Sequence, residues 1–284
     1  MQSFQVDLKG STALVTGGGG ILCSTIAQAL AQSGAKVAIA DLREEAAAGV
    51  AEIINQAGGQ ALAVACNVLE KESLEQARAV IENKFGAPDI LVNGAGGNHP
   101  KGTTSKPYLL PEDLKEQIEG VTSFFDLDPK GIEFVFNLNF LGTLLPTQVF
   151  ARAMAENGKG SILNVSSMNA FTPLTKIPAY SGAKAAVSNF TQWLAVHFSK
   201  VGVRVNAIAP GFFLTDQNRS LLTHPDGSLT ERGQTIISQT PMGRYGNPED
   251  LLGAVLWLLS SEAAGFVTGT VIPIDGGFSA FSGV

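Results

Sequence analysis

Short apolar segments that alternate with longer helical segments are the feature that most restricts the fold of this chain. Seven segments rich in Val, Ile, Leu and Ala have the length of strands: Thr12–Thr16, Lys36–Ala40, Ala61–Cys66, Ile90–Asn93, Ser161–Val165, Val203–Ala207 and Val271–Ile274. They are largely apolar along their whole length, which is typical of strands buried on both faces. The alternation therefore predicts an α/β fold with a doubly wound parallel sheet of about seven strands.

Helical segments fill the intervals between these strands. The predicted helices are Leu22–Ser33, Glu44–Gln56, Glu72–Lys84, Ile132–Asn157, Ala179–Ser199 and a last one from Pro248 to about Ser260. No linker or internal repeat interrupts the pattern, so the 284 residues predict a single domain, residues 1–284. The irregular stretch Gly97–Gly131 follows a strand, and we expect it at the carboxyl edge of the sheet, where ligands bind in such folds.

Composition and charge exclude several classes of protein. The formal net charge of −6 predicts no nucleic-acid partner and no anionic membrane surface as a partner. No stretch of about 18 apolar residues is present, so we expect no membrane-spanning helix, and the N-terminus has no signal-peptide pattern. Two cysteines, Cys23 and Cys66, form no disulfide framework, and the three histidines lack metal-ligand spacing. We expect a cytoplasmic protein without a metal.

Four consecutive glycines, Gly17–Gly20, lie between the first strand and the first helix. Backbone N–H groups at such a turn, together with the positive end of the helix dipole, can bind a phosphate. Asp41 ends the next strand, at the position of an acid that bonds ribose hydroxyls and repels a 2′-phosphate. This order predicts a Rossmann-type dinucleotide site that takes NAD. NADP is the less favoured alternative, because Arg43 could accept a 2′-phosphate.

A tyrosine and a lysine, Tyr180 and Lys184, lie one turn apart on one face of a predicted helix. A phenol with a pKa near 10 is a poor base at neutral pH, and a nearby cation is expected to lower that pKa. Such a tyrosine can act as a general acid or base. Ser167 follows a strand 13 residues earlier, and its hydroxyl could bond the oxygen of a carbinol or carbonyl substrate.

These motifs together resemble the short-chain dehydrogenase/reductase family over essentially the whole chain. The matching stretches are Thr16-Gly17, Asn93-Gly-Ala-Gly96, Asn139-Phe-Leu-Gly142, Ser166-Ser167, Tyr180 with Lys184, Val205–Gly211 and Asp275-Gly-Gly277. The resemblance implies a catalytic tetrad of Asn139, Ser167, Tyr180 and Lys184. Tyr180 would exchange a proton with the substrate oxygen, Ser167 would orient that oxygen, Lys184 would bond the nicotinamide ribose, and Asn139 would hold a water in a proton relay.

The resemblance also implies a set of coenzyme contacts and an oligomer. The expected coenzyme-binding residues are Gly17, Gly19, Gly20, Ile21, Leu22, Asp41, Asn67, Val68, Asn93, Ala95, Gly96, Pro210, Gly211, Phe213 and Thr215. The family implies a homotetramer or a homodimer.

The chain departs from the family pattern at several positions. Ile21 and Cys23 stand where the turn pattern TGxxxGxG has its second and third glycines, and Gly94 replaces the second asparagine of the NNAG motif. Asn67 stands where an aspartate is usual. The interval before Asn139 is longer than usual, so residues 97–131 are expected to be an inserted segment on the substrate side.

Further motifs resemble the group of this family known as D-mannonate oxidoreductases, or fructuronate reductases. They include Thr16–Leu22, Gly94–Pro100, Phe124–Asp128, Ser166–Phe171 and Pro210–Arg219. That group interconverts D-mannonate and D-fructuronate with NAD, so a small-molecule sugar acid is the expected substrate. Its hydroxyls and carboxylate would be bound by Asn98, His99, Asn169, Gln217 and Arg219.

Two other functions remain open at this stage. The chain could be another short-chain reductase, such as a gluconate or polyol dehydrogenase or a 3-oxoacyl reductase. It could also be a non-catalytic NAD-binding regulator, although the tetrad of polar residues argues against that.

Overall fold

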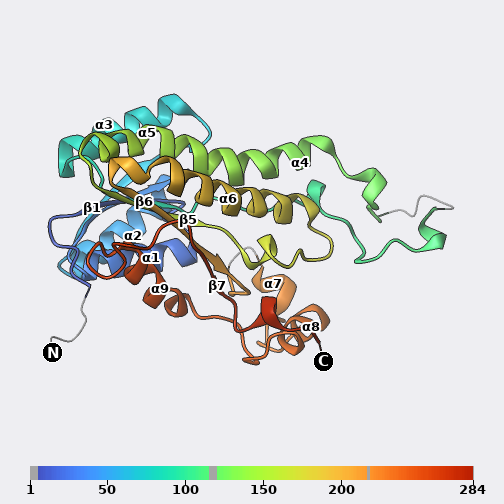
Figure 1. Ribbon diagram of the computed structural model, residues 1–284. Helices are drawn as coiled ribbons and strands as arrows, with labels where there is room; N and C mark the ends of the chain where they lie inside the picture. The colour runs from blue at the N-terminus through green and yellow to red at the C-terminus, as the bar shows by residue number, and fades with distance from the viewer. Residues whose placement is uncertain (1–5, 115–119, 216–217, 284) are drawn as a thin grey trace.

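A single parallel sheet forms the centre of the molecule (Figure 1). The computed structural model describes residues 6–114, 120–215 and 218–283. Within them the strands are β1 (Thr12–Thr16), β2 (Lys36–Asp41), β3 (Gln60–Ala65), β4 (Ile90–Asn93), β5 (Gly160–Val165), β6 (Val203–Pro210) and β7 (Val271–Ile274). Their spatial order is β3-β2-β1-β4-β5-β6-β7, and every neighbouring pair is parallel. The predicted α/β fold of the Rossmann type is confirmed.

Helices cover both faces of the sheet. They are α1 (Ile21–Gln32), α2 (Glu44–Gln56), α3 (Lys71–Phe85), α4 (Pro129–Phe136), α5 (Gly142–Glu156), α6 (Pro178–His197), α7 (Arg219–Leu222), α8 (Glu231–Ser238) and α9 (Leu252–Leu259). In Figure 1, α3, α5 and α6 lie on one side of the sheet, and α1, α2 and α9 lie on the other. The inner strands are therefore buried on both faces, as the apolar sequence pattern predicts, whereas the edge strands β3 and β7 are partly exposed.

Successive strand residues feed two separate cores. Along β1, Leu14 packs into the cluster beneath α3, α5 and α6, whereas Ala13 and Val15 pack into the cluster on the α1 side. All three side chains are fully buried. Because neighbouring strand residues point to opposite faces, a strand between two helix layers must be apolar at consecutive positions.

The sheet places two loops side by side at its carboxyl edge. β1 lies between β2 and β4, so the chain winds outward in opposite directions from this point. Thr16 and Asn93, the last residues of β1 and β4, are paired in register. The loops that follow them therefore meet at the position where ligands bind in doubly wound folds.

The predicted helix over residues 132–157 is interrupted. α4 ends at Phe136, a π-helical turn covers Asn137–Leu141, and α5 starts at Gly142. Such turns occur within longer helices, frequently at functional sites. By length and composition alone, the combined helix Pro129–Glu156 is long and apolar enough to cross a membrane. From the apolar pattern of the sequence, no stretch of this kind is expected. Half of its most apolar window is buried inside the fold, which is typical of a core helix.

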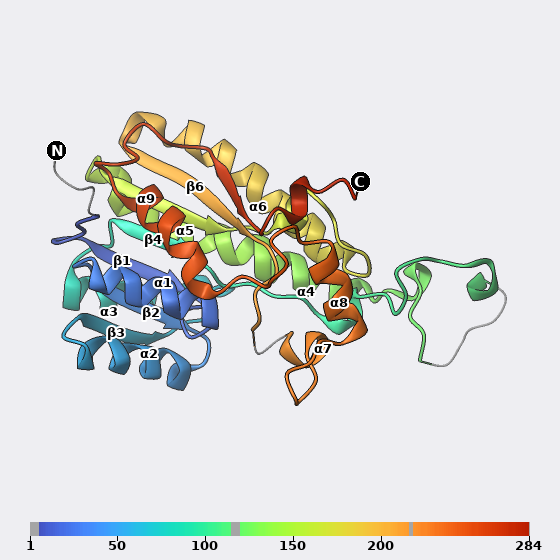
Figure 2. The same cartoon turned by 90° about the horizontal axis from the view of Figure 1, so that it is seen from below.

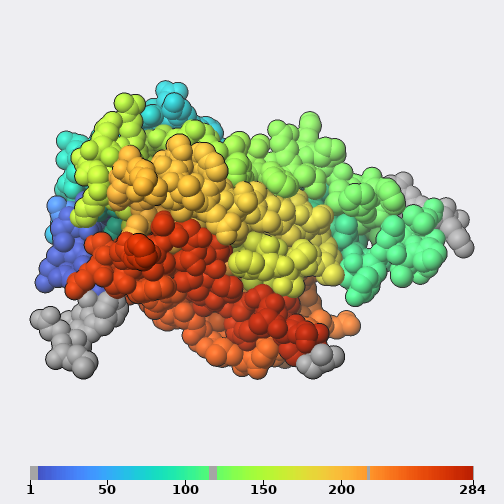
Figure 3. Space-filling model, viewed as in Figure 1, coloured from blue at the N-terminus to red at the C-terminus, as the bar shows by residue number. Residues whose placement is uncertain are grey.

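The described residues between β4 and α4, 97–114 and 120–128, include an arm that projects from the body (Figures 1 and 2). Hydrogen bonds at its base join Thr104 to the Lys176 carbonyl and Ser105 to the Thr122 carbonyl. Tyr108, Phe124 and Phe125 in the described part of the arm are exposed by 66–72%. In the space-filling view the arm stands clear of the other elements, so its own fold leaves these rings uncovered (Figure 3).

Gly202 permits the sharp return from the end of α6 into β6. Its φ is +72°, and a Cβ added there would lie 2.1 Å from the Gly158 carbonyl oxygen. We expect Gly202→Ala to lower the free energy of unfolding by about 2 kcal/mol or more, because both strain and a steric clash result. Urea denaturation measures the loss.

A matched glycine change provides the control. Gly253 is exposed within α9, and a Cβ there would meet no atom within 4 Å. Gly253→Ala should leave stability unchanged or raise it by up to about 1 kcal/mol, because alanine favours helix. Equal effects of the two substitutions would contradict the role assigned to Gly202.

Candidate active site

Four polar side chains from different elements meet at the carboxyl edge of the sheet. Asn139 lies in the π-helical turn, Ser167 follows β5, and Tyr180 and Lys184 lie on α6. The glycine at position 96 shows how closely they converge. A Cβ added to Gly96 would lie 2.7 Å from the Asn139 Oδ1 and 3.1 Å from the Lys184 Nζ. The predicted tetrad is therefore assembled around the loop after β4.

Tyr180 and Ser167 are hydrogen-bonded to each other within this cluster. The Ser167 Oγ accepts a hydrogen bond from the Asn169 N–H at 3.3 Å, which orients the hydroxyl at the N-terminus of a short 3₁₀ turn. Burial raises the pKa of the Tyr180 phenol, and its hydrogen bond with Ser167 opposes that rise. The phenol therefore holds its proton at neutral pH and is suited to act first as a general acid.

Lys184 is a buried cation held beneath the tyrosine ring. Its Nζ donates a 2.7 Å hydrogen bond to the Val165 carbonyl and lies 5.7 Å from the centroid of the Tyr180 ring. Burial lowers the pKa of Lys184 to about 8. The net pKa of Tyr180 is raised because burial outweighs its hydrogen bond with Ser167, and the expected lowering by Lys184 stays a prediction.

Asn139 clamps the loop that follows β4. Its Nδ2 donates to the carbonyl oxygens of Gly97 and Val135, at 2.7 and 2.8 Å, and its Oδ1 accepts from the Gly97 N–H at 3.2 Å. Asn139 is fully buried. The side chain thus fixes the loop beside Lys184, and the water relay expected for Asn139 stays a prediction.

The glycine turn packs too tightly for side chains. A Cβ on Gly18 would lie 2.6 Å from the Ile39 Cγ2, and a Cβ on Gly19 would lie 2.6 Å from the Ala46 Cβ. Gly17 has a φ of +62°, which glycine adopts without strain. The missing family glycine at Ile21 is tolerated, because Ile21 is the first residue of α1 and lies outside this crowded region.

The N–H groups of the turn are unequally available to a phosphate. The Gly19 N–H bonds the Asp41 carboxylate at 3.0 Å, and the Gly20 N–H bonds the Gly17 carbonyl at 3.1 Å. Among the described residues, the N–H groups of Ile21 and Leu22 have no acceptor, as expected in the first turn of a helix. These two point to the phosphate position at the N-terminus of α1.

Asp41 is anchored at the end of β2. Its Oδ2 accepts the Gly19 N–H and its Oδ1 accepts the Arg43 N–H, each at 3.0 Å. The Arg43 side chain is 71% exposed, and its Nε lies 3.8 Å from the same carboxylate. The turn therefore ends beside a fixed negative charge, which favours ribose hydroxyls over a 2′-phosphate.

The remaining coenzyme candidates have different surroundings. Ala95 and Gly96 lie beside the glycine turn and the tetrad. The Asn67 side chain bonds the Leu69 N–H and Glu70 near the start of α3, next to buried Val68.

Asn93 is built into the core instead of the site. Its Nδ2 donates to the Thr147 Oγ1 and the Asn164 Oδ1, at 3.0 and 2.9 Å. These bonds tie β4 to β5 and α5. Within the described part of the chain the Asn93 side chain bonds only these two partners, so coenzyme binding by this side chain stays a prediction.

The loop after β6 carries the last coenzyme candidates, which follow Pro210. Gly211 is packed so closely on Asp275 that a Cβ would lie 2.6 Å from the Asp275 Cα. Phe213 is buried against Gly246, and the Thr215 N–H bonds the Asn218 Oδ1 at 2.8 Å.

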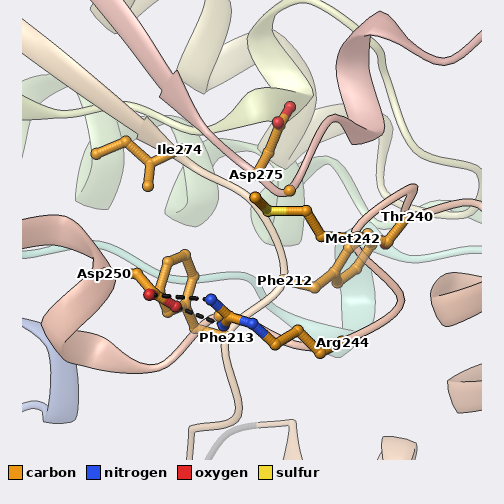
Figure 4. A pocket seen from close by; sticks show the side chains of 10 residues that line it. Phe212, Phe213, Thr240, Met242, Arg244, Asp250, Ile274 and Asp275 are labelled. Atoms are coloured by element: carbon orange, nitrogen blue, oxygen red, sulfur yellow. Dashed lines mark hydrogen bonds and ion pairs between the residues drawn. The ribbon is translucent and has the colours of Figure 1, made fainter.

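A pocket of about 230 Å³ lies beside this loop (Figure 4). Phe212, Phe213 and Met242 line it, and the ion pair of Arg244 with Asp250 borders it. None of the tetrad residues lines this pocket. We assign it a structural role in holding the loop after β6.

The substrate candidates lie on three segments. Asn98 is exposed and bonds the Thr103 Oγ1, and the His99 Nδ1 accepts the Lys101 N–H while its ring lies against Phe134. Arg219 is exposed at the start of α7. Gln217 lies outside the described residues.

Asn169 is the substrate candidate that the structure places nearest the tetrad. It is 4% exposed, and its Oδ1 is buried without a hydrogen-bond partner in the part of the chain that the structure describes. Its N–H bonds Ser167. A buried amide oxygen without a partner is costly, so this atom is ready to accept a hydrogen bond from a ligand.

Sequence reasoning missed the contacts made by backbone and by pairs of distant residues. The Val165 carbonyl that holds Lys184 and the π-helical turn that frees the Val135 carbonyl leave no sequence pattern. No cluster of three metal-ligating side chains occurs within residues 6–114, 120–215 and 218–283.

Comparison with known proteins agrees with this arrangement. The family model described as enoyl-(acyl carrier protein) reductase, a short-chain dehydrogenase model, matches residues 20–279. Two relatives named only as uncharacterized oxidoreductases, from Haemophilus influenzae and Bacillus subtilis, are 57% and 52% identical over 98% of this chain, covering 96% and 98% of their own lengths. A crystal structure from Haemophilus influenza, provisionally named D-mannonate oxidoreductase and containing bound NAD, is 56% identical with a TM-score of 0.92, covering 98% of both chains.

The lowered pKa of Lys184 predicts a pH dependence of stability. Between about pH 8 and 10.5 the unfolded chain binds more protons at this residue than the folded protein does, so rising pH relieves the cost of burying the charge. Relative to Lys184→Met, the protein free of coenzyme should gain roughly 2–3 kcal/mol of unfolding free energy from pH 7.5 to pH 10. Urea denaturation of both proteins across this range measures the difference, and a pH-independent difference would contradict the assignment.

Proposed function

The chain belongs to the short-chain dehydrogenase/reductase family, and within it we propose that this oxidoreductase interconverts D-mannonate and D-fructuronate with NAD. The observation that carries the proposal is the 56% identity, over 98% of the chain, to the NAD-containing structure provisionally named D-mannonate oxidoreductase. The assembled tetrad supports catalysis over a purely regulatory role, because a binding module needs no buried Tyr180–Lys184 pair.

The residues at the edge of the sheet fit NAD. The glycines at 17–19 let the turn pack closely against neighbouring elements, and the N–H groups of Ile21 and Leu22 that follow it are suited to the diphosphate. Asp41 is suited to the hydroxyls of the adenosine ribose. Lys184, whose Nζ lies beside Gly96, is suited to bond the nicotinamide ribose.

The mechanism divides proton and hydride transfer between the chain and its coenzyme. The bound coenzyme accepts a hydride from the carbinol carbon or, in the opposite direction, supplies one to the carbonyl carbon. In reduction, Tyr180 gives its phenolic proton to the carbonyl oxygen, which Ser167 orients through a hydrogen bond. The Lys184 Nζ lies 5.7 Å from the centroid of the Tyr180 ring, and its positive charge stabilises the resulting phenolate. Asn139 holds the Gly97 backbone so that this geometry persists.

The substrate is proposed to bind on the side of the arm and the loop after β6. Asn169 offers its unpartnered Oδ1 to a substrate hydroxyl, next to Ser167. Arg219 can bind the carboxylate, and Asn98 and His99 lie at the base of the arm to bind the far hydroxyls. Residues 97–131 would then act as the inserted substrate-side segment.

Two further features accompany this proposal. The exposed rings of Tyr108, Phe124 and Phe125 support self-association, with a homotetramer favoured over a homodimer. Free, buried Cys23 and Cys66 support a reducing compartment, and we assign the enzyme to the cytoplasm.

Coenzyme preference can be tested at Asp41. Asp41→Asn keeps oxygen and polarity but removes the charge, so the ratio of kcat/KM for NADH over NADPH should fall at least tenfold, or about 1.4 kcal/mol. Steady-state kinetics with both coenzymes measure this ratio. Arg43→Ala is the control, and it should leave the preference for NADH in place. A wild-type preference for NADPH, lost in Arg43→Ala, would contradict the assignment to NAD.

The substrate proposal is tested with a panel of carbonyl compounds. NADH oxidation should be fastest with D-fructuronate among keto-sugar acids, and a 3-oxoacyl thioester should react far more slowly. Tyr180→Phe should lower kcat about 100-fold or more while the Kd for NADH changes less than threefold, because only the acid is lost. Turnover of the acyl thioester without turnover of any uronate would favour the acyl-reductase alternative.

A further inference from the structure

We propose that Cys23 and Gly94 form one coupled pair that positions the coenzyme-binding turn against the loop after β4. Cys23 lies in the first turn of α1, and Gly94 is the first residue after β4. The pair is a positioning device, since neither side chain is assigned a contact with substrate or coenzyme. The expected effect of the pair on coenzyme binding rests on the proposed function.

The cysteine sulfur occupies the volume that a side chain at position 94 would need. A Cβ added to Gly94 would lie 2.1 Å from the Cys23 Sγ but 3.6 Å from the Cys23 Cβ. Within Cys23 the clash therefore belongs to the sulfur atom, and a second close approach, 2.8 Å, is to the Thr16 carbonyl oxygen. The family pattern has a glycine at the position of Cys23 and an asparagine at the position of Gly94, so this chain departs from the pattern at both places. The structure shows that these departures are one spatial exchange: a larger residue at 23 requires a smaller one at 94.

The pair lies at the joint between the two edge loops. The Thr16 Oγ1 accepts hydrogen bonds from the N–H groups of Gly94 and Ala95, at 3.1 and 3.4 Å. A Cβ on Gly17 would lie 2.9 Å from the Ala95 backbone. Two residues further on, Gly96 packs against the side chains of Asn139 and Lys184. A shift at position 94 is thus transmitted to the phosphate turn on one side and to the tetrad on the other.

Packing, rather than thiol chemistry, is the role that fits Cys23. The side chain is 5% exposed, and burial raises the pKa of its thiol to about 12. A neutral, buried thiol is neither a nucleophile nor a metal ligand at neutral pH. The size and shape of the Cys23 side chain are therefore the properties that matter for packing against Gly94.

A double-mutant cycle tests the coupling. The four proteins are wild type, Cys23→Ala, Gly94→Ala and the double variant Cys23→Ala/Gly94→Ala. Alanine at 23 removes the sulfur and keeps the Cβ, whose distance to a Cβ at 94 is an ordinary contact. The residual close approach of a Cβ at 94 to the Thr16 carbonyl, at 2.8 Å, is shared by both Gly94 variants and cancels in the cycle. The readouts are the NADH Kd by fluorescence, kcat at saturating NADH, and the urea midpoint.

We expect Gly94→Ala to weaken NADH binding at least tenfold, and the added Cys23→Ala to restore at least fivefold of that loss. kcat at saturating NADH should change less than threefold in the double variant, since the tetrad is intact. Cys66→Ala is the matched control, because Cys66 is buried in the opposite core cluster and bonds toward Ser73. Combined with Gly94→Ala, it should restore nothing.

If the effects of the two substitutions are additive, the coupling is overturned. It is also overturned if Gly94→Ala fails to fold and the double variant fails in the same way. Rescue of folding by Cys23→Ala supports it. Non-additive urea midpoints with unchanged NADH affinity in all four proteins would show a packing pair without a positioning role, and would overturn that part. Wild-type protein that binds no NADH refutes the proposed function instead, and the urea midpoints then decide the coupling alone.

Discussion

The close approach of two backbone loops is the constraint on which the site depends. The turn after β1 and the loop after β4 touch through Gly17 and Ala95, and Gly96 then passes between Asn139 and Lys184 with no space for a side chain. Backbone in contact with backbone cannot adjust as a flexible side chain can. The positions of the phosphate-binding N–H groups and of the catalytic cation are therefore linked through a few glycines.

Burial gives the catalytic pair its chemistry. The same loss of solvent raises the pKa of Tyr180 and lowers that of Lys184, because each shift favours the neutral form of its group. The shifts therefore reverse the ordinary order, in which the ammonium has the slightly higher pKa of the two. Proton exchange between Tyr180 and a substrate oxygen becomes responsive to any charge that arrives, including that of a coenzyme.

The fold separates the tetrad from the projecting arm. The tetrad is held by the sheet edge, α6 and the π-helical turn, all of which are packed into the body. The arm, within residues 97–114 and 120–128, is hydrogen-bonded to that body at its base and carries exposed aromatic rings. A rigid site beside a projecting segment allows the substrate range to differ among relatives that keep the same reaction.

The sequence by itself determined the layered α/β fold and the approximate strand positions, and it singled out the four residues proposed as the tetrad. Continuous apolar segments can be buried in few ways, and the spacing of Tyr180 and Lys184 is a local property of one helix. Only the tertiary structure decided the pKa shifts, the π-helical turn around Asn139 and the fit of Cys23 over Gly94. These depend on burial and on contacts between residues tens of positions apart, and neither quantity is encoded in a local pattern.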